Sequence, residues 1–137
     1  MKVYLDENLP PLIAQPLAAV YQQHQFATYR DEHLAGVEDI PLMDALRARG
    51  FDAIVTRDRN QLKDPLERTA VLRSGMRWVG VADKRLKGLE QITITVATLM
   101  AGMRFVFEHE MEGPTSYALM TVPHTQLQRV KIRPITA

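Results

Sequence analysis

The chain contains no cysteine among its 137 residues, which excludes disulfide bonds and a thiolate zinc site. A protein without disulfides fits the reducing environment of the cytosol. The N-terminus also lacks the basic region and the apolar run of a signal peptide. From these absences we expect a cytoplasmic protein.

Long hydrophobic runs and linkers are also missing. The most apolar stretch, residues 92–107, contains three threonines and Arg104, which favours a buried helix over a membrane span. No Gly/Ser-rich linker, internal repeat or low-complexity tract divides the chain. A length of 137 residues is typical of one domain, so we expect a single domain over residues 1–137 that makes no contact with a membrane.

Several catalytic patterns are absent as well. The chain has no glycine-rich phosphate loop and no Ser-His-Asp or Cys-His arrangement, and its four histidines show no metal-ligand spacing. The overall charge is only +1, but its distribution is uneven. Residues 1–56 hold four basic and eight acidic side chains, whereas residues 57–87 hold nine basic and four acidic ones. This distribution suits an anionic substrate held near metal-binding carboxylates, but on charge alone a mixed solvated surface is the favoured interpretation.

Strand and helix signals alternate over the first 110 residues, which predicts an α/β fold with a mainly parallel sheet and helices on its faces. Pro16 lies inside the first helical pattern and should kink or shorten it. Near the C-terminus, residues 117–122 and 127–132 read as two strands joined by a turn at Pro123-His124, which predicts a β-hairpin. The predicted strands are Lys2–Leu5, Phe26–Tyr29, Asp52–Thr56 and Trp78–Val81, and the predicted helices are residues 12–20, 39–50, 65–74 and 89–107.

Acidic residues follow two of the predicted strands. Asp6 and Glu7 come directly after the first strand, and Asp58 follows the third. Asp39 stands at the start of a predicted helix as a good N-cap residue. Because functional residues in parallel sheets gather at the carboxyl ends of the strands, we expect Asp6, Asp39 and Asp58 to converge.

Converging carboxylates need an opposite charge, because they cannot all stay ionised next to one another. A hard divalent cation such as Mg²⁺ or Mn²⁺ prefers oxygen ligands and supplies that charge. The basic residues Arg57, Arg59 and Lys63 could then hold phosphates beside the metal. The other interpretation is that Asp39 caps a helix and that Asp6 belongs to a solvated loop, and the residue types alone leave both open.

The sequence resembles PIN-like domains over most of its length. The stretch VYLDENLPP is similar to the opening of these domains. EDIPLMDALRARG, followed by FDAIVTRDRNQ, is similar to their later motifs, an acid that opens a helix and a strand that ends in Thr-x-Asp. DPLERTAVLRSG and GPTSYALMTVP resemble the branch that includes VapC-type toxins of bacterial toxin–antitoxin pairs.

The resemblance implies a Rossmann-like α/β/α fold and a metal-dependent endoribonuclease. Asp6, Asp39 and Asp58 match the family's acidic motifs, which implies that they bind Mg²⁺ or Mn²⁺ and are catalytic. Asn60 stands where many relatives carry a further acid, so Asn60, together with Glu7, is expected to support the site. The resemblance also implies RNA as the substrate, an antitoxin protein as the partner and a homodimer as a possible assembly.

Family members usually carry a glutamate between the first and later motifs, and Glu32 and Glu38 both compete for this role. Two other functions are considered. Because Asn60 brings no negative charge, the chain could be a degenerate PIN-like module that only binds RNA or protein. A receiver-like signalling domain would use Asp58 as phospho-acceptor, but it needs a lysine at the end of a fifth parallel strand. Lys131 lies in a predicted antiparallel strand, so that match is poor.

Overall fold

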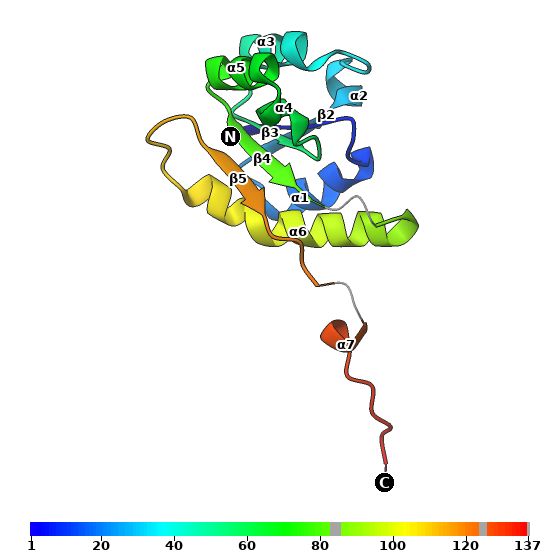
Figure 1. The fold of residues 1–137 in the computed structure, drawn as a ribbon. Coiled ribbons are helices and arrows are strands. Elements are labelled where there is room, and N and C mark those ends of the chain that lie inside the picture. The colour runs from blue at the N-terminus through cyan, green and yellow to red at the C-terminus, as the bar shows by residue number, and fades with distance from the viewer. Residues whose placement is uncertain (83–85, 124–125, 137) are drawn as a thin grey trace.

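The computed structural model describes residues 1–82, 86–123 and 126–136, and its centre is one five-stranded sheet (Figure 1). The strand order is β2-β1-β3-β4-β5, and every neighbouring pair is parallel. The predicted α/β fold with helices on both faces of the sheet is therefore confirmed. The strands are β1 (Lys2–Leu5), β2 (Gln25–Thr28), β3 (Ala53–Thr56), β4 (Arg77–Val81) and β5 (Ser116–Leu119). The helices are η1 (Pro11–Ile13), α1 (Ala14–Val20), α2 (Tyr29–Glu32), α3 (Asp39–Ala48), α4 (Asn60–Lys63), α5 (Pro65–Ser74), α6 (Gly88–Glu108) and α7 (Gln126–Arg129).

One face of the sheet is covered by η1, α1 and α6, which lie below it in Figure 1. Alternate residues of the central strands, such as Val3 and Val55, point into this layer and are fully buried. They meet Ile13 and Leu17 from the first helices and Leu99 from α6. Burying a side chain of this size stabilises the fold by roughly 1.5–3 kcal/mol, so this layer fixes β1 and β3 at the centre of the sheet.

The other face is covered by α3, α4 and α5. Here the alternate strand residues are Tyr4, Ile54 and Trp78, and they pack against Met43 and Leu46 of α3. The ring of Tyr4 also meets Phe51 edge to face. Since neighbouring strand residues point to opposite faces, the same short strands supply both core layers.

The α-helix that contains Pro16 is shorter than the helix predicted over residues 12–20, as expected. Residues 11–13 form the 3-10 turn η1, and α1 begins only at Ala14. Pro16 therefore lies in the first turn of α1, where a missing N–H removes no intrahelical hydrogen bond. The helix itself, α1, ends at Val20 as predicted.

The longest helix is α6, and it confirms the helix predicted over residues 89–107. Its buried side chains include Ile94, Leu99, Met103 and Val106, and its opposite side leaves Phe105 exposed. Within the part of the chain that the structure describes, no helix is both long and apolar enough to cross a membrane.

The predicted C-terminal hairpin is wrong. The first of its strands exists as β5, but β5 pairs in parallel with β4 after the crossover helix α6. The short helix α7 (Gln126–Arg129) overlaps the first half of the second predicted strand. The reason lies between them: Thr121 Oγ1 donates to the Ala82 carbonyl at 3.0 Å and Val122 N donates to Thr98 Oγ1 at 3.2 Å. These bonds hold the chain at the end of β4 and on α6. His124 of the predicted turn lies outside the described residues.

Candidate functional site

The carboxyl ends of β1 and β3 meet at the centre of the sheet. In a doubly wound sheet of order 2-1-3-4-5, the strand order reverses between β1 and β3, and ligand sites lie in the crevice at that point. Asp6 directly follows β1, and its N–H donates to the Val55 carbonyl at 2.9 Å. The backbone of Asp6 thus continues the sheet, and only 5% of the residue is exposed. Asp58 stands two residues beyond the end of β3.

The carboxylate of Asp6 is held by hydrogen bonds on both oxygens. Oδ1 accepts from the backbone N–H of Glu7 at 2.9 Å. Oδ2 accepts from the Thr56 hydroxyl at 2.8 Å and from Gln61 Nε2 at 3.3 Å. Asn8 Nδ2 lies 3.4 Å from the same oxygen. A carboxylate with this many fixed donors has one orientation, which is what a metal ligand or a catalytic acid needs.

The buried hydroxyl of Thr56 joins the ends of the two strands. It donates to Asp6 and accepts from the N–H of Asp58 at 3.0 Å and from Asn8 Nδ2 at 3.0 Å. Asn8 also accepts from the N–H of Arg57 through Oδ1 at 3.1 Å. The loop after β1 is therefore tied to the loop after β3, and Asp58 is placed beside Asp6 although the two lie 52 positions apart in the sequence.

Asp39 joins the site through a glutamine. It begins α3, but Glu38 is the N-cap residue, so the prediction that Asp39 caps this helix is wrong by one position. Asp39 Oδ1 instead accepts from Gln61 Nε2 at 2.9 Å, and the same nitrogen also donates to Asp6. Gln61 is fully buried. One amide thus holds carboxylates from α3 and from the end of β1.

Gln61 is itself held by Trp78. The indole Nε1 donates to Gln61 Oε1 at 3.0 Å, which satisfies the polar atom of a buried tryptophan. Gly80 leaves room for the ring, because a Cβ at Gly80 would lie 2.6 Å from Cζ3 of Trp78. The position of the amide therefore depends on the packing of β4.

A fourth carboxyl group comes from Glu67 in the first turn of α5. Its Oε2 atom is buried and has no hydrogen-bond partner among the described residues. Burial is the main cause of the raised pKa of Glu67, followed by the charges of Asp39, Asp64 and Asp58. Hydrogen bonding between the carboxyl groups of Asp39 and Glu67 contributes as well, which places them side by side. We call Asp6, Asp39, Asp58 and Glu67 the carboxylate cluster.

Burial and mutual repulsion act on the other members too. Burial is the largest cause of the raised pKa of Asp6 and of Asp39. Hydrogen bonds from Thr56 to Asp6 and from Gln61 to Asp39 offset part of each rise. The charge of Asp39 then raises the pKa of Asp6, and the charge of Asp58 raises that of Asp39. The ionised cluster is therefore under electrostatic stress.

No basic side chain relieves this stress within the part of the chain that the structure describes. The four ion pairs found there all join other residues. The donor set is anionic, consists of oxygens and includes the unpartnered Oε2 atom of Glu67, so its chemistry fits a hard divalent cation. In residues 1–82, 86–123 and 126–136, no group of three or more acidic or histidine side chains is arranged so that it could hold a metal ion. The N–H group of Gln61 offsets the charges of Asp6 and Asp39 instead.

The expected supporting acids lie elsewhere or act on the backbone. Glu7 is exposed, and its Oε2 accepts from the N–H of Gly36 at 3.1 Å, which ties down the loop before α3. Glu32 pairs with Lys2 and Arg49, so it does not join the cluster. Glu38, the other candidate glutamate, is an exposed N-cap residue. The glutamate that does lie beside Asp39 is Glu67.

Asn60, two residues after the Thr-x-Asp motif, and the basic residues near it differ in their surroundings. Asn60 is exposed, and its backbone N–H donates to Asp58 Oδ1 at 2.9 Å. Arg57 is half-buried, and its Nη2 donates to the Thr95 hydroxyl of α6 at 2.6 Å. Arg59 and Lys63 are exposed and form no ion pair with a described residue. Of the three basic candidates, these two face solvent.

Sequence reasoning missed three residues of the site, Asn8, Gln61 and Glu67. Asn8 follows the first acidic pair, and its amide at a turn was a usable signal for a loop contact. A buried tryptophan requires an acceptor, so Trp78 implied a partner without identifying Gln61. Glu67 follows the N-cap residue Asp64 by three positions, which made it look like part of a helix start.

Comparison with known proteins adds a family assignment. A family model described as "PIN like domain" matches residues 1–83 of the chain. This segment contains β1 to β4 and all four members of the carboxylate cluster. Neither the curated proteins nor the solved structures contain a match to the chain.

Proposed function

Because the chain belongs to the PIN-like domain family, we propose that it is a metal-dependent endoribonuclease that hydrolyses phosphodiester bonds in RNA. One observation carries this proposal. Four carboxyl groups meet at the strand switch point of the sheet, three of them with raised pKa values, and no described basic residue pairs with them. Perturbed pKa values that gather at one place in a fold are typical of functional sites.

Asp6, Asp39 and Asp58 would hold Mg²⁺ or Mn²⁺, with Glu67 beside them. Bound there, such an ion orients a water molecule and stabilises negative charge on phosphate oxygens. The chain's own residues keep the acids in position. Thr56 and Gln61 fix the carboxylate of Asp6 through hydrogen bonds of 2.8 and 3.3 Å.

Substrate binding falls to the basic residues after β3. Arg59 and Lys63 are exposed on the segment that follows Asp58 and can contact phosphates, while Arg57 spans from the end of β3 to α6. Asn60, next to Asp58, can hold a water molecule through its amide. Such phosphate contacts bind RNA without reading its sequence and weaken as salt rises.

The finer assignment concerns the biological role. We propose that the protein is the toxin of a toxin–antitoxin pair in the cytoplasm, that an antitoxin protein neutralises it, and that residues 1–137 act as one domain. The motifs that resemble VapC-type toxins support this proposal. Expression of the chain alone should arrest growth, and expression of Asp58→Asn should not.

A specific observation supports a second candidate, a degenerate module that binds RNA without cleaving it. The amide of Gln61 already bridges Asp6 and Asp39, and Asn60 supplies no charge. The receiver-like alternative loses support. β5 is indeed a fifth parallel strand, but it ends at Leu119 and is followed by Met120, where a receiver needs a lysine.

The deciding experiment is cleavage of single-stranded RNA by the full chain. With Mn²⁺ present, the wild-type protein should cleave and EDTA should stop the reaction. Asp58→Asn should lose cleavage, while Asp44→Asn, an exposed acid on α3, should retain it. RNA that is bound across a panel of sequences and metals but never cut would favour the degenerate module.

A further inference from the structure

The last strand of the sheet has an open edge. β5 pairs with β4 on one side, and its other side has no strand partner among the described residues. Open edges of this kind are templates for pairing with another chain, and proteins usually cover them. The side chains of β5 alternate between exposed and half-buried along Ser116–Leu119.

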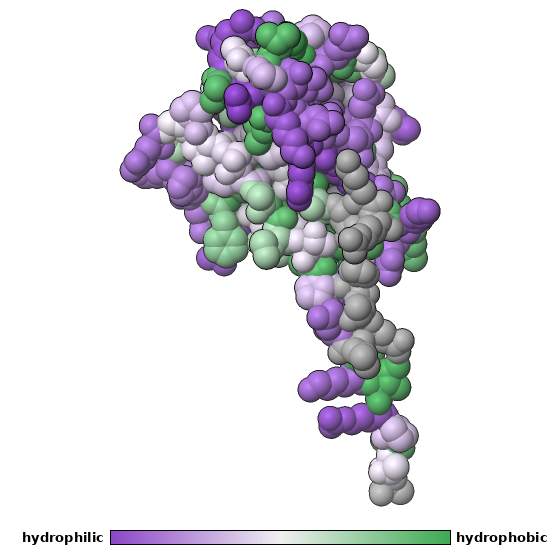
Figure 2. Space-filling view, in the orientation of Figure 1, coloured by the Kyte–Doolittle hydropathy of each residue, from purple (hydrophilic) through white to green (hydrophobic). Residues whose placement is uncertain are grey.

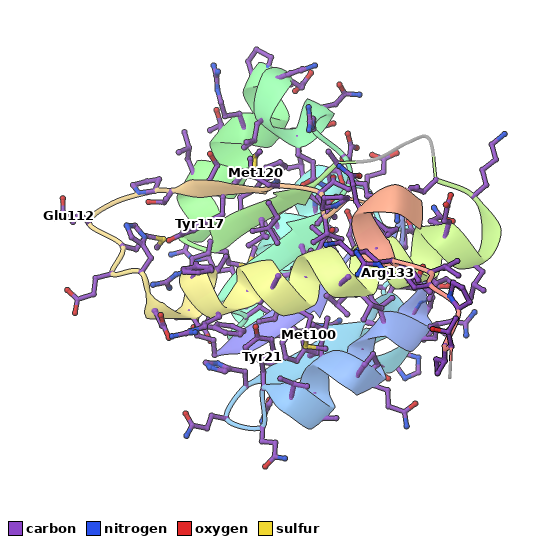
Figure 3. All side chains as sticks on the ribbon, turned by 90° about the horizontal axis from the view of Figure 1, so that it is seen from below. Tyr21, Met100, Glu112, Tyr117, Met120 and Arg133 are labelled. Carbon is purple, nitrogen blue, oxygen red and sulfur yellow. The ribbon has the colours of Figure 1, made fainter. Side chains whose placement is uncertain are left out.

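An apolar groove runs along this edge between β5 and α6. Tyr117, Leu119 and Met120 line it from the strand side, and Phe105 lines it from α6. Phe105 is 67% exposed and Met120 is 88% exposed. Figure 2 shows apolar surface gathered over this stretch of α6 and β5, and Figure 3 shows Tyr117 and Met120 along the strand.

The C-terminal segment carries a matching pattern. Residues 126–136 project away from the sheet (Figure 1), and in them Val130 and Ile132 are 53% and 74% exposed. Val130-Lys131-Ile132-Arg133 alternates apolar and basic side chains, which is the period of a half-buried strand. Pro134 follows, and proline ends a strand because it cannot donate to the ladder. Among the described residues, residues 130–133 pair with no strand of the sheet.

We propose that residues 129–133 of one copy add as an antiparallel strand to the β5 edge of a second copy, and that the exchange is reciprocal. The segment leaves the sheet in the direction in which β5 runs (Figure 1). A twofold axis beside it lays each segment along the partner's β5 in the opposite direction. Val130 and Ile132 then enter the groove, and backbone hydrogen bonds close the open edge.

Charge supports this direction. In an antiparallel arrangement the end of the segment reaches the loop before β5, which contains the exposed Glu110 and Glu112. Neither glutamate forms an ion pair with a described residue. Figure 3 shows Glu112 at the tip of this loop and Arg133 in the projecting segment. Lys131 and Arg133 of the partner supply the complementary charges.

Pairing of the segment with β5 of its own chain is disfavoured. The hydrogen bonds from Thr121 to Ala82 and from Val122 to Thr98 direct the chain away from the open edge. A fold-back would require a turn within the few residues that include Pro123. A second copy meets the edge without such a turn.

Solution mass is the first test. Sedimentation equilibrium of the full chain over a wide concentration range should fit a monomer–dimer equilibrium. Ile132→Glu should shift it to monomer, whereas Leu12→Glu, an equally simple change at a residue 57% exposed in η1, should leave it unchanged. A wild-type chain that stays monomeric throughout, or a dimer that survives Ile132→Glu, would overturn the proposal.

The second test uses the absence of cysteine to place the contact. Copies with Val130→Cys or Ile132→Cys are mixed with copies that carry Tyr117→Cys or Leu119→Cys, and the mixture is oxidised. At least one pair should form a cross-linked heterodimer, because antiparallel neighbours lie within disulfide reach. Lys131→Cys, whose side chain points to the opposite face, should cross-link least. Cross-links that form only when both cysteines are in one chain would show a fold-back and refute the exchange.

The charge contacts give a smaller effect. Arg133→Glu should raise the dissociation constant of the dimer by up to about fivefold per lost ion pair. Combining it with Glu112→Lys should restore most of the affinity. A dissociation constant that neither substitution alters would show that the segment does not pass this loop.

Discussion

The carboxylate cluster at the carboxyl end of the sheet and the β5 edge differ in what each leaves unpaired among the described residues. The carboxylate cluster leaves negative charge without a cation, inside the segment that matches the family model. The β5 edge leaves backbone groups and apolar side chains without a partner, outside that segment. The carboxylate cluster suits a cation and an anionic substrate, and the β5 edge suits an added strand.

This difference separates chemistry from assembly. Two members of the cluster, Asp6 and Asp58, follow β1 and β3, and the other two stand on α3 and α5. These strands and helices all contribute buried residues to the core, so the core fixes the geometry of the cluster. The edge is built on a four-residue strand and a projecting segment with little packing of its own. Changes in the cluster should therefore affect activity and metal response, and changes at the edge should affect mass.

The largest expected effect is on RNA cleavage. Asp58→Asn should lower the initial rate by about a hundredfold or more, a typical loss when a group that stabilises developing charge is removed. Ile132→Glu should leave the rate per chain unchanged, because the edge lies apart from the strand ends. Both rates are measured with a fluorescent single-stranded RNA in Mn²⁺. An equal loss of cleavage rate in the two variants would show that the β5 edge also contributes to activity.

Metal should stabilise the cluster and not the edge. An ion that binds only the folded chain adds about 2.7 kcal/mol at a hundredfold excess over its dissociation constant. The melting temperature should rise with Mn²⁺, and Asp6→Asn should abolish the rise while Ile132→Glu should keep it. A rise that persists in Asp6→Asn would place the metal elsewhere.

Gln61 bridges two acids of the cluster, so its replacement should lower the free energy of unfolding even without metal. Gln61→Leu leaves the indole N–H of Trp78 buried without an acceptor, which costs about 1–3 kcal/mol of unfolding free energy. Asn60→Leu is the matched control, because that amide is exposed. Urea unfolding measures both. Equal stability of the two variants would mean that the bridge does not hold the site together.

The smallest effect concerns pH in the presence of EDTA. Burial raises the pKa of Glu67 above the ordinary 4.5. The favourable contribution of Glu67 to the free energy of unfolding is therefore fully present below pH 4.5 and is lost as the pH rises through the raised pKa. Glu67→Gln removes this loss. Its melting temperature relative to wild type should therefore increase from pH 4.5 toward neutral pH. Glu90→Gln on α6 should show no such trend, and a flat difference for Glu67→Gln would argue against repulsion in the cluster.

The sequence predicted the fold well where the hydrophobic period of a segment matches the burial of its residues in the structure. Four strands and α6 were found because alternating or helical spacing matches their burial, as in Val3 and Leu99. The convergence of Asp6 and Asp58 followed from the parallel sheet alone. The hairpin was wrong because Val130 and Ile132 have a strand pattern that the single chain does not use, and no local signal reveals which edge a strand will join.

The site was predicted only in part, for a related reason. Asp39 was expected both to open its helix as the N-cap and to converge with Asp6; the cap is Glu38, and the carboxylate of Asp39 turns toward Gln61. Gln61 and Glu67 lie in stretches that resemble the family, but no role was assigned to them, because their roles arise from the way α4 and α5 pack against the sheet. Residues that act through packing in this way cannot be read from spacing along the chain.

The most direct test of the central claim is calorimetric titration of the metal-free full chain with Mn²⁺. The account predicts one ion bound per chain, no binding in Asp39→Asn, and unchanged binding in Asp44→Asn on the same helix. Absence of binding in the wild-type chain, or equal binding in both variants, would contradict the assignment of the carboxylate cluster as a metal site.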